Sequence, residues 1–547
     1  MMRNINQKYA KERYGPDGIL WDYKPQCPDD FNFAYDVVDD IAINDPERRA
    51  MVWLSRDKVV RTFTFARMRE WSNRTANYFA SLGIKKGDAV LVSLKRHYQF
   101  WYTILALHKL GAIAVPVTFM LTKHDFEYRI NSSSASAIVC TADGDTAQAL
   151  DDALPESPSM KLRILVGGKR DGWHDFDSEM PLFGTEFERV PTLARDPMLI
   201  FFSSGTSGYP KMVLHDHTYP VGHLLTAKHW QKVNPDGLHL TIADTGWGKA
   251  VWGKLYGQWL MEAGVFIYDF DKFDAADILS VVSQYKITTL CCPPTMFRMF
   301  LNEGVEKYDL SSLEYVTIAG EALNPDTFEQ WRKATGLKLM EGFGQTETTV
   351  TVLNIAGMTP KPGSMGKPSP QYQVQIVDEE GMRCLPGETG EIVISCNPYP
   401  MGLMSCYYKD ENRTAEVIKD GWYHTGDTAW MDEDGYFWYV GRMDDIIKSS
   451  GYRIGPFEIE SVLITHPSVL ECAVTGVPDP VRGQIVKATV VLVPGVEPSE
   501  ELKKELQDYV KKETSPYKYP RVIEFIKELP RTINGKIRRV AIRKGDE

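Results

Sequence analysis

Hydrophobic and polar positions alternate in regular blocks through the first part of the chain. Apolar residues recur at helical spacing in three segments, 64–82, 97–110 and 126–131. Short apolar runs of strand length lie between and after them, at 89–94, 112–117 and 137–140. Because helices and buried strands alternate at this pitch, the pattern predicts layered α/β subdomains built on parallel sheets. Segments 278–292 and 315–319 continue the same alternation.

The pattern changes after about residue 361. Glycine and proline become frequent and separate short alternating strands, such as 372–377 and 391–395, which predict a small β subdomain over about 361–441. A second boundary is expected near Gly441. Beyond it the chain predicts a compact α+β domain over 442–547, with helices at 456–463 and 499–512 and strands at 471–477, 486–493 and 522–525.

Length and composition narrow the class of protein. A chain of 547 residues exceeds the usual size of one hydrophobic core, so two or more domains are expected. The formal net charge of -11 argues against broad binding of nucleic acid. The eight cysteines have no zinc-site spacing and suit a reduced compartment. The first residues lack the apolar core of a signal peptide, and no apolar run is long enough to span a membrane, so a cytoplasmic protein is expected.

A loop rich in glycine and hydroxyl groups follows the apolar run 198–202. Glycines let the backbone approach a phosphate closely, and hydroxyls and a lysine add hydrogen-bond donors. The lysine does not follow a glycine directly, so this is not a Walker A loop. The alternative is a flexible linker. The predicted phosphate-binding residues are Ser203, Ser204, Gly205, Thr206, Ser207, Gly208, Tyr209, Pro210 and Lys211.

Four further motifs predict ligand-binding sites, and each also has a purely structural interpretation. Segment 341–348 combines two glycines with oxygen ligands suited to Mg²⁺, or it is a surface turn. In 422–427 an aspartate after a glycine suits ribose hydroxyls, or it is only a turn. Segment 439–454 holds two arginines suited to phosphate or carboxylate, or they are solvated. In 530–537 an Asn-Gly turn projects a lysine, or it is an ordinary hairpin.

Together, and in this order, the five motifs resemble the sequence blocks of the adenylate-forming superfamily: acyl-CoA synthetases, luciferases and peptide-synthetase adenylation domains. The resemblance covers nearly the whole chain. Segments 449–456, 480–483 and 516–521 look like the medium-chain acyl-CoA synthetases in particular, and 244–254 is similar to microbial members of that branch. The resemblance implies a mobile C-terminal domain, with a hinge at Asp444.

The resemblance also implies a reaction in two halves and a set of residues for the first half. A carboxylate attacks the α-phosphate of ATP to give an acyl-adenylate and pyrophosphate. Lys536, Thr346, Glu347 and Arg442 would be catalytic, with Glu347 holding Mg²⁺. The nucleotide would also meet the phosphate-loop residues 203–211 together with Gly320, Glu321, Ala322, Glu341, Gly342, Phe343, Gly344, Gln345, Asp427 and Arg453.

In the second half CoA displaces AMP to give a thioester. By resemblance CoA would meet Ser450, Gly451, Tyr452, Arg482, Lys511 and Tyr519, and the acyl pocket would be formed by Trp247, Val251, Trp252, Phe343 and Gly344. Acetate-specific relatives carry a bulky Trp at the position of Gly344, so a short or medium, branched or ring-bearing acid is expected. The alternatives are an aryl (benzoate-type) CoA ligase or an adenylating protein without a CoA step. The oligomeric state stays open, with a homodimer as one alternative.

Overall fold

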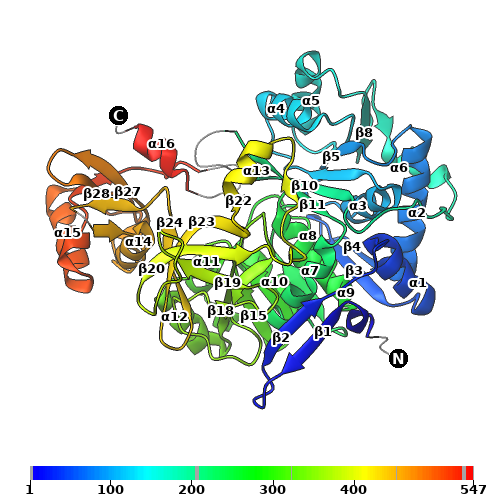
Figure 1. Ribbon diagram of the computed structural model, residues 1–547. Coiled ribbons are helices and arrows are strands. Elements are labelled where there is room, and N and C mark those ends of the chain that lie inside the picture. The colour runs from blue at the N-terminus through cyan, green and yellow to red at the C-terminus, as the bar shows by residue number, and fades with distance from the viewer. Residues whose placement is uncertain (1–3, 204–208, 322, 451, 532–536, 546–547) are drawn as a thin grey trace.

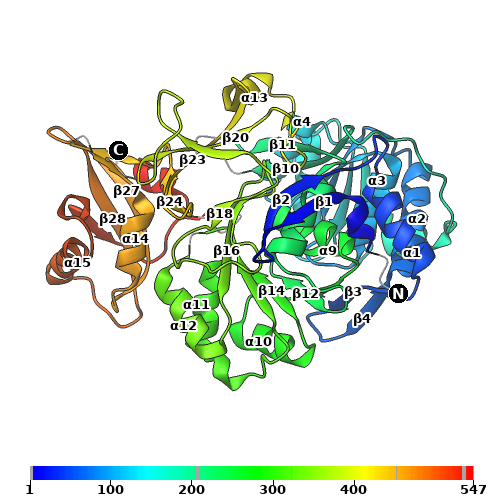
Figure 2. The ribbon, with the colours of Figure 1, turned by 60° about the horizontal axis from the view of Figure 1, so that its bottom comes forward.

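The computed structural model describes residues 4–203, 209–321, 323–450, 452–531 and 537–545. Its helices and strands fall in two parts of unequal size. The C-terminal elements form a small unit at one end of the molecule, and the rest of the chain forms a broad body of stacked sheets and helices (Figure 1, Figure 2). The mixed α/β class expected from the alternating pattern is confirmed.

Two large sheets form the body. In the described residues the first sheet has the order β21 (Cys406–Tyr407), β11 (Lys211–Asp216), β10 (Pro197–Ser203), β6 (Ile113–Pro116), β5 (Ala89–Ser93), β7 (Ala137–Thr141), β8 (Leu162–Val166) and β9 (His174–Asp175). From β10 to β9 neighbouring strands run parallel, whereas β11 and β21 are antiparallel. The parallel part matches the expectation from the strand and helix alternation.

The second sheet has nine strands in the described residues. Their order is β18 (Lys367–Pro368), β17 (Val350–Leu353), β16 (Leu339–Gly344), β15 (Tyr315–Ile318), β14 (Thr289–Cys292), β12 (Leu238–Thr241), β13 (Gly264–Tyr268), β3 (Arg49–Leu54) and β4 (Val60–Thr64). The strands from β16 to β3 are parallel. Parallel strands end at one edge of a sheet, where ligands of α/β proteins bind.

Helices cover these sheets, and several of them begin at a side-chain cap. The helices are α1 (Asp40–Asn44), α2 (Phe65–Ser81), α3 (Gln99–Leu110), α4 (Lys123–Ser133), α5 (Thr146–Ala153), α6 (Phe176–Glu179), α7 (Tyr219–Gly222), α8 (Gly248–Lys254), α9 (Tyr256–Leu260), α10 (Ala275–Gln284), α11 (Pro294–Glu303), α12 (Pro325–Thr335) and α13 (Glu411–Val417). Thr64 caps α2, and Thr122 and Asp125 form a capping box on α4. Every residue of α3 is buried, as expected of a helix packed on all sides.

Smaller sheets complete the chain. One contains β19 (Val374–Val377), β20 (Thr389–Ser395), β22 (Ile418–Lys419), β23 (Trp422–Met431) and β24 (Phe437–Arg442). The C-terminal unit contains β25 (Ile447–Ser449), β26 (Tyr452–Ile454), β27 (Val469–Asp479), β28 (Gly483–Leu492) and β29 (Val522–Phe525), with α14 (Pro456–Ile464), α15 (Glu500–Glu513) and α16 (Arg539–Lys544). A hairpin of β1 (Ala10–Tyr14) and β2 (Leu20–Pro25) lies near the start of the described chain, after a short 3-10 helix at Ile5–Lys8.

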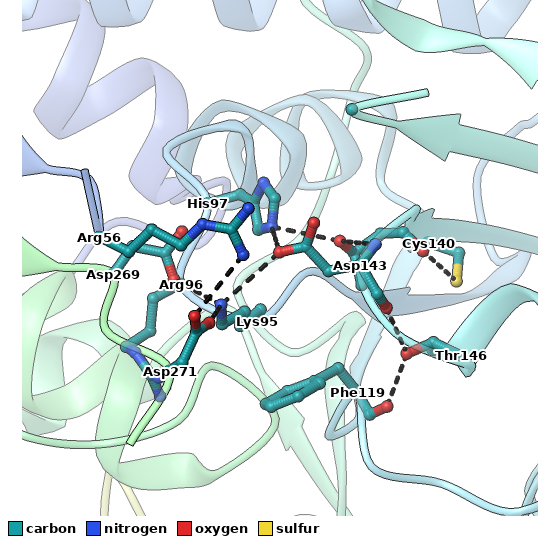
Figure 3. A network of polar contacts seen from close by, with 12 residues as sticks. Arg56, Lys95, Arg96, His97, Phe119, Cys140, Asp143, Thr146, Asp269 and Asp271 are labelled. Carbon is teal, nitrogen blue, oxygen red and sulfur yellow. Dashed lines mark hydrogen bonds and ion pairs between the residues drawn. The ribbon is translucent and has the colours of Figure 1, made fainter. Parts of the chain in front are cut away.

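An ionic cluster ties the two large sheets together at the carboxyl ends of their strands (Figure 3). Lys95, which follows β5 and is 3% exposed, forms ion pairs with Asp143 after β7 and with Asp269 and Asp271 after β13. Arg56, which follows β3, also pairs with Asp271. Because the partners come from both sheets, the cluster links the ends of β5 and β7 to the ends of β3 and β13.

Candidate active site

A cavity of about 1590 Å³ lies between the body and the C-terminal unit. Its walls on the body side come from the ends of β10, β15 and β16 and from β23. On the other side Arg531 and residues 537–540 of the C-terminal unit face it. A cavity of this size at the carboxyl ends of parallel strands suits a nucleotide together with a second small molecule.

Most of the nucleotide residues predicted from the sequence line this one cavity. They are Ser203, Tyr209, Pro210, Lys211, Gly320, Glu321, Glu341, Gly342, Phe343, Gly344, Gln345, Thr346, Glu347, Asp427 and Arg442. Eight other predicted site residues lie outside the described residues: Ser204, Gly205, Thr206, Ser207, Gly208, Ala322, Gly451 and Lys536. The side chain of Arg453 also lies outside the described part of the chain.

Asp427 is the centre of a hydrogen-bond network in the cavity wall. It is 5% exposed and accepts hydrogen bonds from Gln345 Nε2 at 2.5 Å and from the Tyr439 hydroxyl at 2.9 Å. Arg442, its partner across β23 and β24, places Nη1 at 3.5 Å from the carboxylate. These contacts orient the carboxylate on a rigid sheet, as an acceptor for paired hydroxyl groups requires.

Arg442 joins the body to the start of the C-terminal unit. Its Nη1 donates to the Thr425 carbonyl at 3.2 Å, and its Nε lies 3.6 Å from Asp444. Burial lowers the pKa of Arg442, but the carboxylates of Asp427 and Asp444 outweigh it, so the net shift is upward. The guanidinium is therefore a fixed cation in the cavity, adjacent to the predicted hinge.

A second cluster gathers around Glu347, which is 8% exposed. The Tyr407 hydroxyl donates to Glu347 Oε1 at 2.9 Å, and Lys211 Nζ lies 3.4 Å from the same hydroxyl. No partner of Glu347 Oε2 is found among the described residues. Among the residues that the structure describes, no group of three or more His, Cys, Asp or Glu side chains could by itself hold a metal ion. One carboxylate with a free oxygen fits Mg²⁺, which keeps waters and phosphate oxygens as its other ligands.

Glu341 is a buried carboxyl group in the middle of β16. It is 4% exposed, and its Oε1 accepts one hydrogen bond, from the Leu323 backbone N–H at 3.3 Å. Its Oε2 has no partner in the described residues. Burial raises the pKa of Glu341 to about 8.

The five predicted acyl-pocket residues divide into two groups. Phe343 and Gly344 line the cavity, whereas Trp247, Val251 and Trp252 lie on or just before α8 and are not among its described lining residues. Helix α8 is nevertheless adjacent to the strand ends, because Lys249 Nζ donates to the Ala319 carbonyl at 3.1 Å.

The sequence reasoning missed Trp230, which connects α8 to β16. Its ring centroid lies 5.9 Å from that of Trp252, and its indole N–H donates to the Met340 carbonyl at 3.1 Å. A Cβ atom on Gly342 would lie 2.6 Å from the Trp230 ring. Glycine at position 342 therefore permits the tryptophan to pack flat against the strand, a pairing that no local motif could show.

The predicted CoA residues gather on the C-terminal unit. Arg482 Nη1 donates to Ser450 Oγ at 3.3 Å, and Tyr452 stacks on Tyr517 with ring centroids 4.2 Å apart. Lys511 Nζ lies 4.3 Å from the centroid of the Tyr519 ring. None of these described residues lines the large cavity. The C-terminal unit thus presents Arg531 and Ile537 to the cavity and keeps the predicted CoA surface away from it.

Comparison with known proteins identifies the class. The model of the AMP-binding enzyme family matches residues 38–408, and that of the AMP-binding enzyme C-terminal domain matches residues 458–536. The chain therefore belongs to the AMP-binding enzyme family.

Individual proteins of known name or structure are similar to this chain over nearly its whole length. Acyl-coenzyme A synthetase ACSM3, mitochondrial, of Pongo abelii is 40% identical over 539 residues, covering 96% of this chain and 92% of its own. Human acyl-coenzyme A synthetase ACSM4, mitochondrial, is 41% identical and covers 94% of this chain and 90% of its own. The anthranilate CoA ligase AuaEII, solved with anthranoyl-AMP, has a TM-score of 0.87 at 29% identity, covering 95% of this chain and 98% of its own. None of the described helices is long and apolar enough to cross a membrane.

Proposed function

We propose that this chain is an AMP-forming acyl-CoA synthetase, an acid–thiol ligase. It activates a carboxylic acid with ATP to an acyl-adenylate and pyrophosphate, and then transfers the acyl group to CoA. The observation that carries the proposal is the single cavity that unites the phosphate-loop stems, Glu347, Asp427 and Arg442. Relatives that match nearly the whole of this chain and are named acyl-coenzyme A synthetases support the reaction class.

In the first half-reaction the protein binds and orients charged groups and needs little acid or base catalysis. Asp427 accepts the ribose hydroxyls, and Arg442 stabilises that carboxylate. Lys211 binds the phosphate chain, and Glu347 holds Mg²⁺, which would neutralise phosphate charge when bound. Lys536 contacts the oxygens of the carboxylate and the α-phosphate. Its sequence neighbours Arg531 and Ile537 pair with each other and line the cavity, which supports this role.

In the second half-reaction the C-terminal domain rotates. We place the domain boundary between residues 441 and 442 and the hinge at Asp444. The rotation withdraws the segment of Lys536 and brings Ser450, Gly451 and Tyr452 to the cavity, with Arg482, Lys511 and Tyr519 near the phosphates of CoA. The arrangement of the described residues supports this order, because the 531–537 side faces the cavity while the CoA surface does not.

The acid is of short or medium length, straight or branched. Support comes from Gly344 and Phe343 in the cavity wall and from the tryptophans 230 and 252 behind it. An aryl acid is the second candidate, favoured by the fold-level similarity to the anthranilate CoA ligase. A cytoplasmic location also remains a prediction, since the relatives named above are mitochondrial.

A panel of acids tests the function and separates these candidates. AMP release is measured for acetate, butyrate, 2-methylbutyrate, octanoate and benzoate, each with and without CoA. We expect the largest kcat/KM for a four- to eight-carbon aliphatic acid, and AMP release that depends on CoA. AMP release that no acid stimulates would contradict the adenylation step, and a clear preference for benzoate would favour the aryl alternative.

Tyr407 provides a separate test of the Glu347 site. Replacing Tyr407 by Phe keeps the ring beside Lys211 but removes the hydroxyl group, which donates to Glu347 Oε1 and lies 3.4 Å from Lys211 Nζ. A hydrogen bond to a charged group is worth about 1.5–3 kcal/mol, so we expect KM for Mg·ATP to rise about tenfold or more. Titration of kcat/KM against Mg²⁺ concentration checks it. Tyr408→Phe is the matched control, and an unchanged Mg²⁺ dependence in Tyr407→Phe would contradict the assignment.

A further inference from the structure

The phosphate end of the cavity contains a buried arginine that the predicted set of site residues does not include. Arg129, on α4, is 7% exposed and lines the same cavity as Ser203 and Lys211. An arginine buried to this degree is costly unless its charge is matched by anions or hydrogen-bond acceptors. Its partners therefore indicate whether the guanidinium is satisfied by the protein alone.

The guanidinium is only partly engaged. Nη1 donates to the Asp125 carbonyl at 3.0 Å and lies 3.1 Å from Asp125 Oδ1. Nε and Nη2 have no hydrogen-bond partner among the described residues. Asp125 is itself occupied, because it accepts hydrogen bonds from the Thr122 backbone N–H and hydroxyl in the helix cap. The free Nε and Nη2 edge is the side of arginine that forms paired hydrogen bonds with phosphate.

Helix α4 also holds both stems of the predicted phosphate loop. Arg129 lies over the Phe202 ring at 5.2 Å from its centroid, on the incoming stem. Tyr128 stacks on Tyr209 at 4.5 Å and donates its hydroxyl to the Pro210 carbonyl at 2.8 Å, on the outgoing stem. The guanidinium is thus fixed beside the end of β10. Lys211, the first residue of β11, lies at the same edge of the sheet.

We propose that Arg129 binds the β- and γ-phosphates of ATP, and after adenylation the pyrophosphate, through its free Nε and Nη2 edge. The inference rests on the proposed function, because it assigns the phosphate end of that nucleotide site. Arg129 and Lys211 then hold the leaving pyrophosphate from two elements, while Asp427 and Arg442 hold the ribose. AMP, which lacks the two terminal phosphates, does not use Arg129.

Calorimetric binding of three probes to the full-length protein tests the assignment: ATP, inorganic pyrophosphate and AMP, each with Mg²⁺. For Arg129→Met we expect affinity for ATP and pyrophosphate to fall roughly tenfold or more, with affinity for AMP unchanged. Arg129→Lys keeps the charge and the partner of Asp125 but lacks the paired edge, so its loss is expected to be intermediate. Arg67→Met, at an exposed arginine on α2 that does not line the cavity, is the matched control and should change none of the three affinities.

The outcomes are distinct. Unchanged pyrophosphate affinity in both Arg129 variants overturns the proposal. An equal loss for AMP and ATP also overturns it, because a collapsed loop or helix affects both nucleotides alike. If Arg129→Met does not fold, the Arg129→Lys comparison still decides between these results. If the wild-type protein binds pyrophosphate and AMP but no acid stimulates AMP release, the proposed function is refuted and the Arg129 assignment still holds.

Discussion

Replacing Lys536 by Ala is expected to abolish adenylation while sparing thioester formation from supplied acyl-adenylate. The lysine would provide a preplaced cation for the charge that develops between the carboxylate and the α-phosphate. Loss of one such contact in the transition state reduces the rate by about a hundredfold or more. Arg531 and Ile537, which flank the lysine segment, line the cavity with Thr346 and Asp427. The described arrangement therefore suits the first half-reaction.

The two half-reactions are measured separately. Pyrophosphate release, with the acid and ATP supplied, reports on the first, and acyl-CoA formation from synthetic acyl-adenylate reports on the second. Lys527→Ala, an exposed lysine in the same domain, is the matched control and is expected to change neither rate. Equal losses in both half-reactions would argue against a rotating domain, because they would require Lys536 to serve one fixed arrangement.

Much of the fold could be predicted from local pattern. Helix α2 begins after its threonine cap, as expected from segment 64–82, and the buried strands β5, β6 and β7 lie where the apolar runs are. Such signals are local, since capping and periodicity depend on residues within a few positions. Strand β16 extends to Gly344, inside the segment 341–348 that the sequence left as either a ligand-binding motif or a surface turn. Its extension depends on pairing with β17, which the isolated segment does not reveal.

The site likewise contains residues that local motifs predict and residues that only the tertiary structure reveals. Described residues from each of the five motifs line one cavity. Tyr407 lies 60 positions from Glu347 and was not predicted, since its role depends on β21 pairing with β11. Arg129 was missed for the same reason. A single tyrosine or arginine on a helix or strand carries no local signature of what it contacts.

At Gly344 the structure gives a physical reason for glycine that differs from the one the sequence suggested. The sequence suggested that glycine there removes a wall from the acyl pocket. Gly344 does line the cavity, but a Cβ atom on it would lie 2.4 Å from the Thr349 carbonyl oxygen. A side chain would therefore displace the paired backbone of β16 and β17. The structure supports close strand approach as the constraint on this glycine, and its effect on acid size stays a prediction.

The final prediction concerns Glu341 and the dependence of stability on pH. Burial raises the pKa of Glu341 in the folded protein to about 8, whereas an exposed glutamate has a pKa near ~4.3. Between these values the unfolded chain releases the proton and the folded chain keeps it. Folding stability therefore falls as pH rises through this range, and the fall ends above about pH 8, where the folded carboxyl group also ionises.

Glu341→Gln removes this dependence, because the amide resembles the protonated acid and does not titrate. We expect the variant and the wild type to have similar stability near pH ~4 and to diverge up to pH ~8, with the variant more stable by ~3–5 kcal/mol at the upper end. Unfolding midpoints measured at each pH check this difference. Glu314→Gln, at an exposed position just before β15, is the matched control and should show no such trend. A constant difference between Glu341→Gln and wild type at every pH would mean that Glu341 is ionised throughout, with its charge compensated in the cavity.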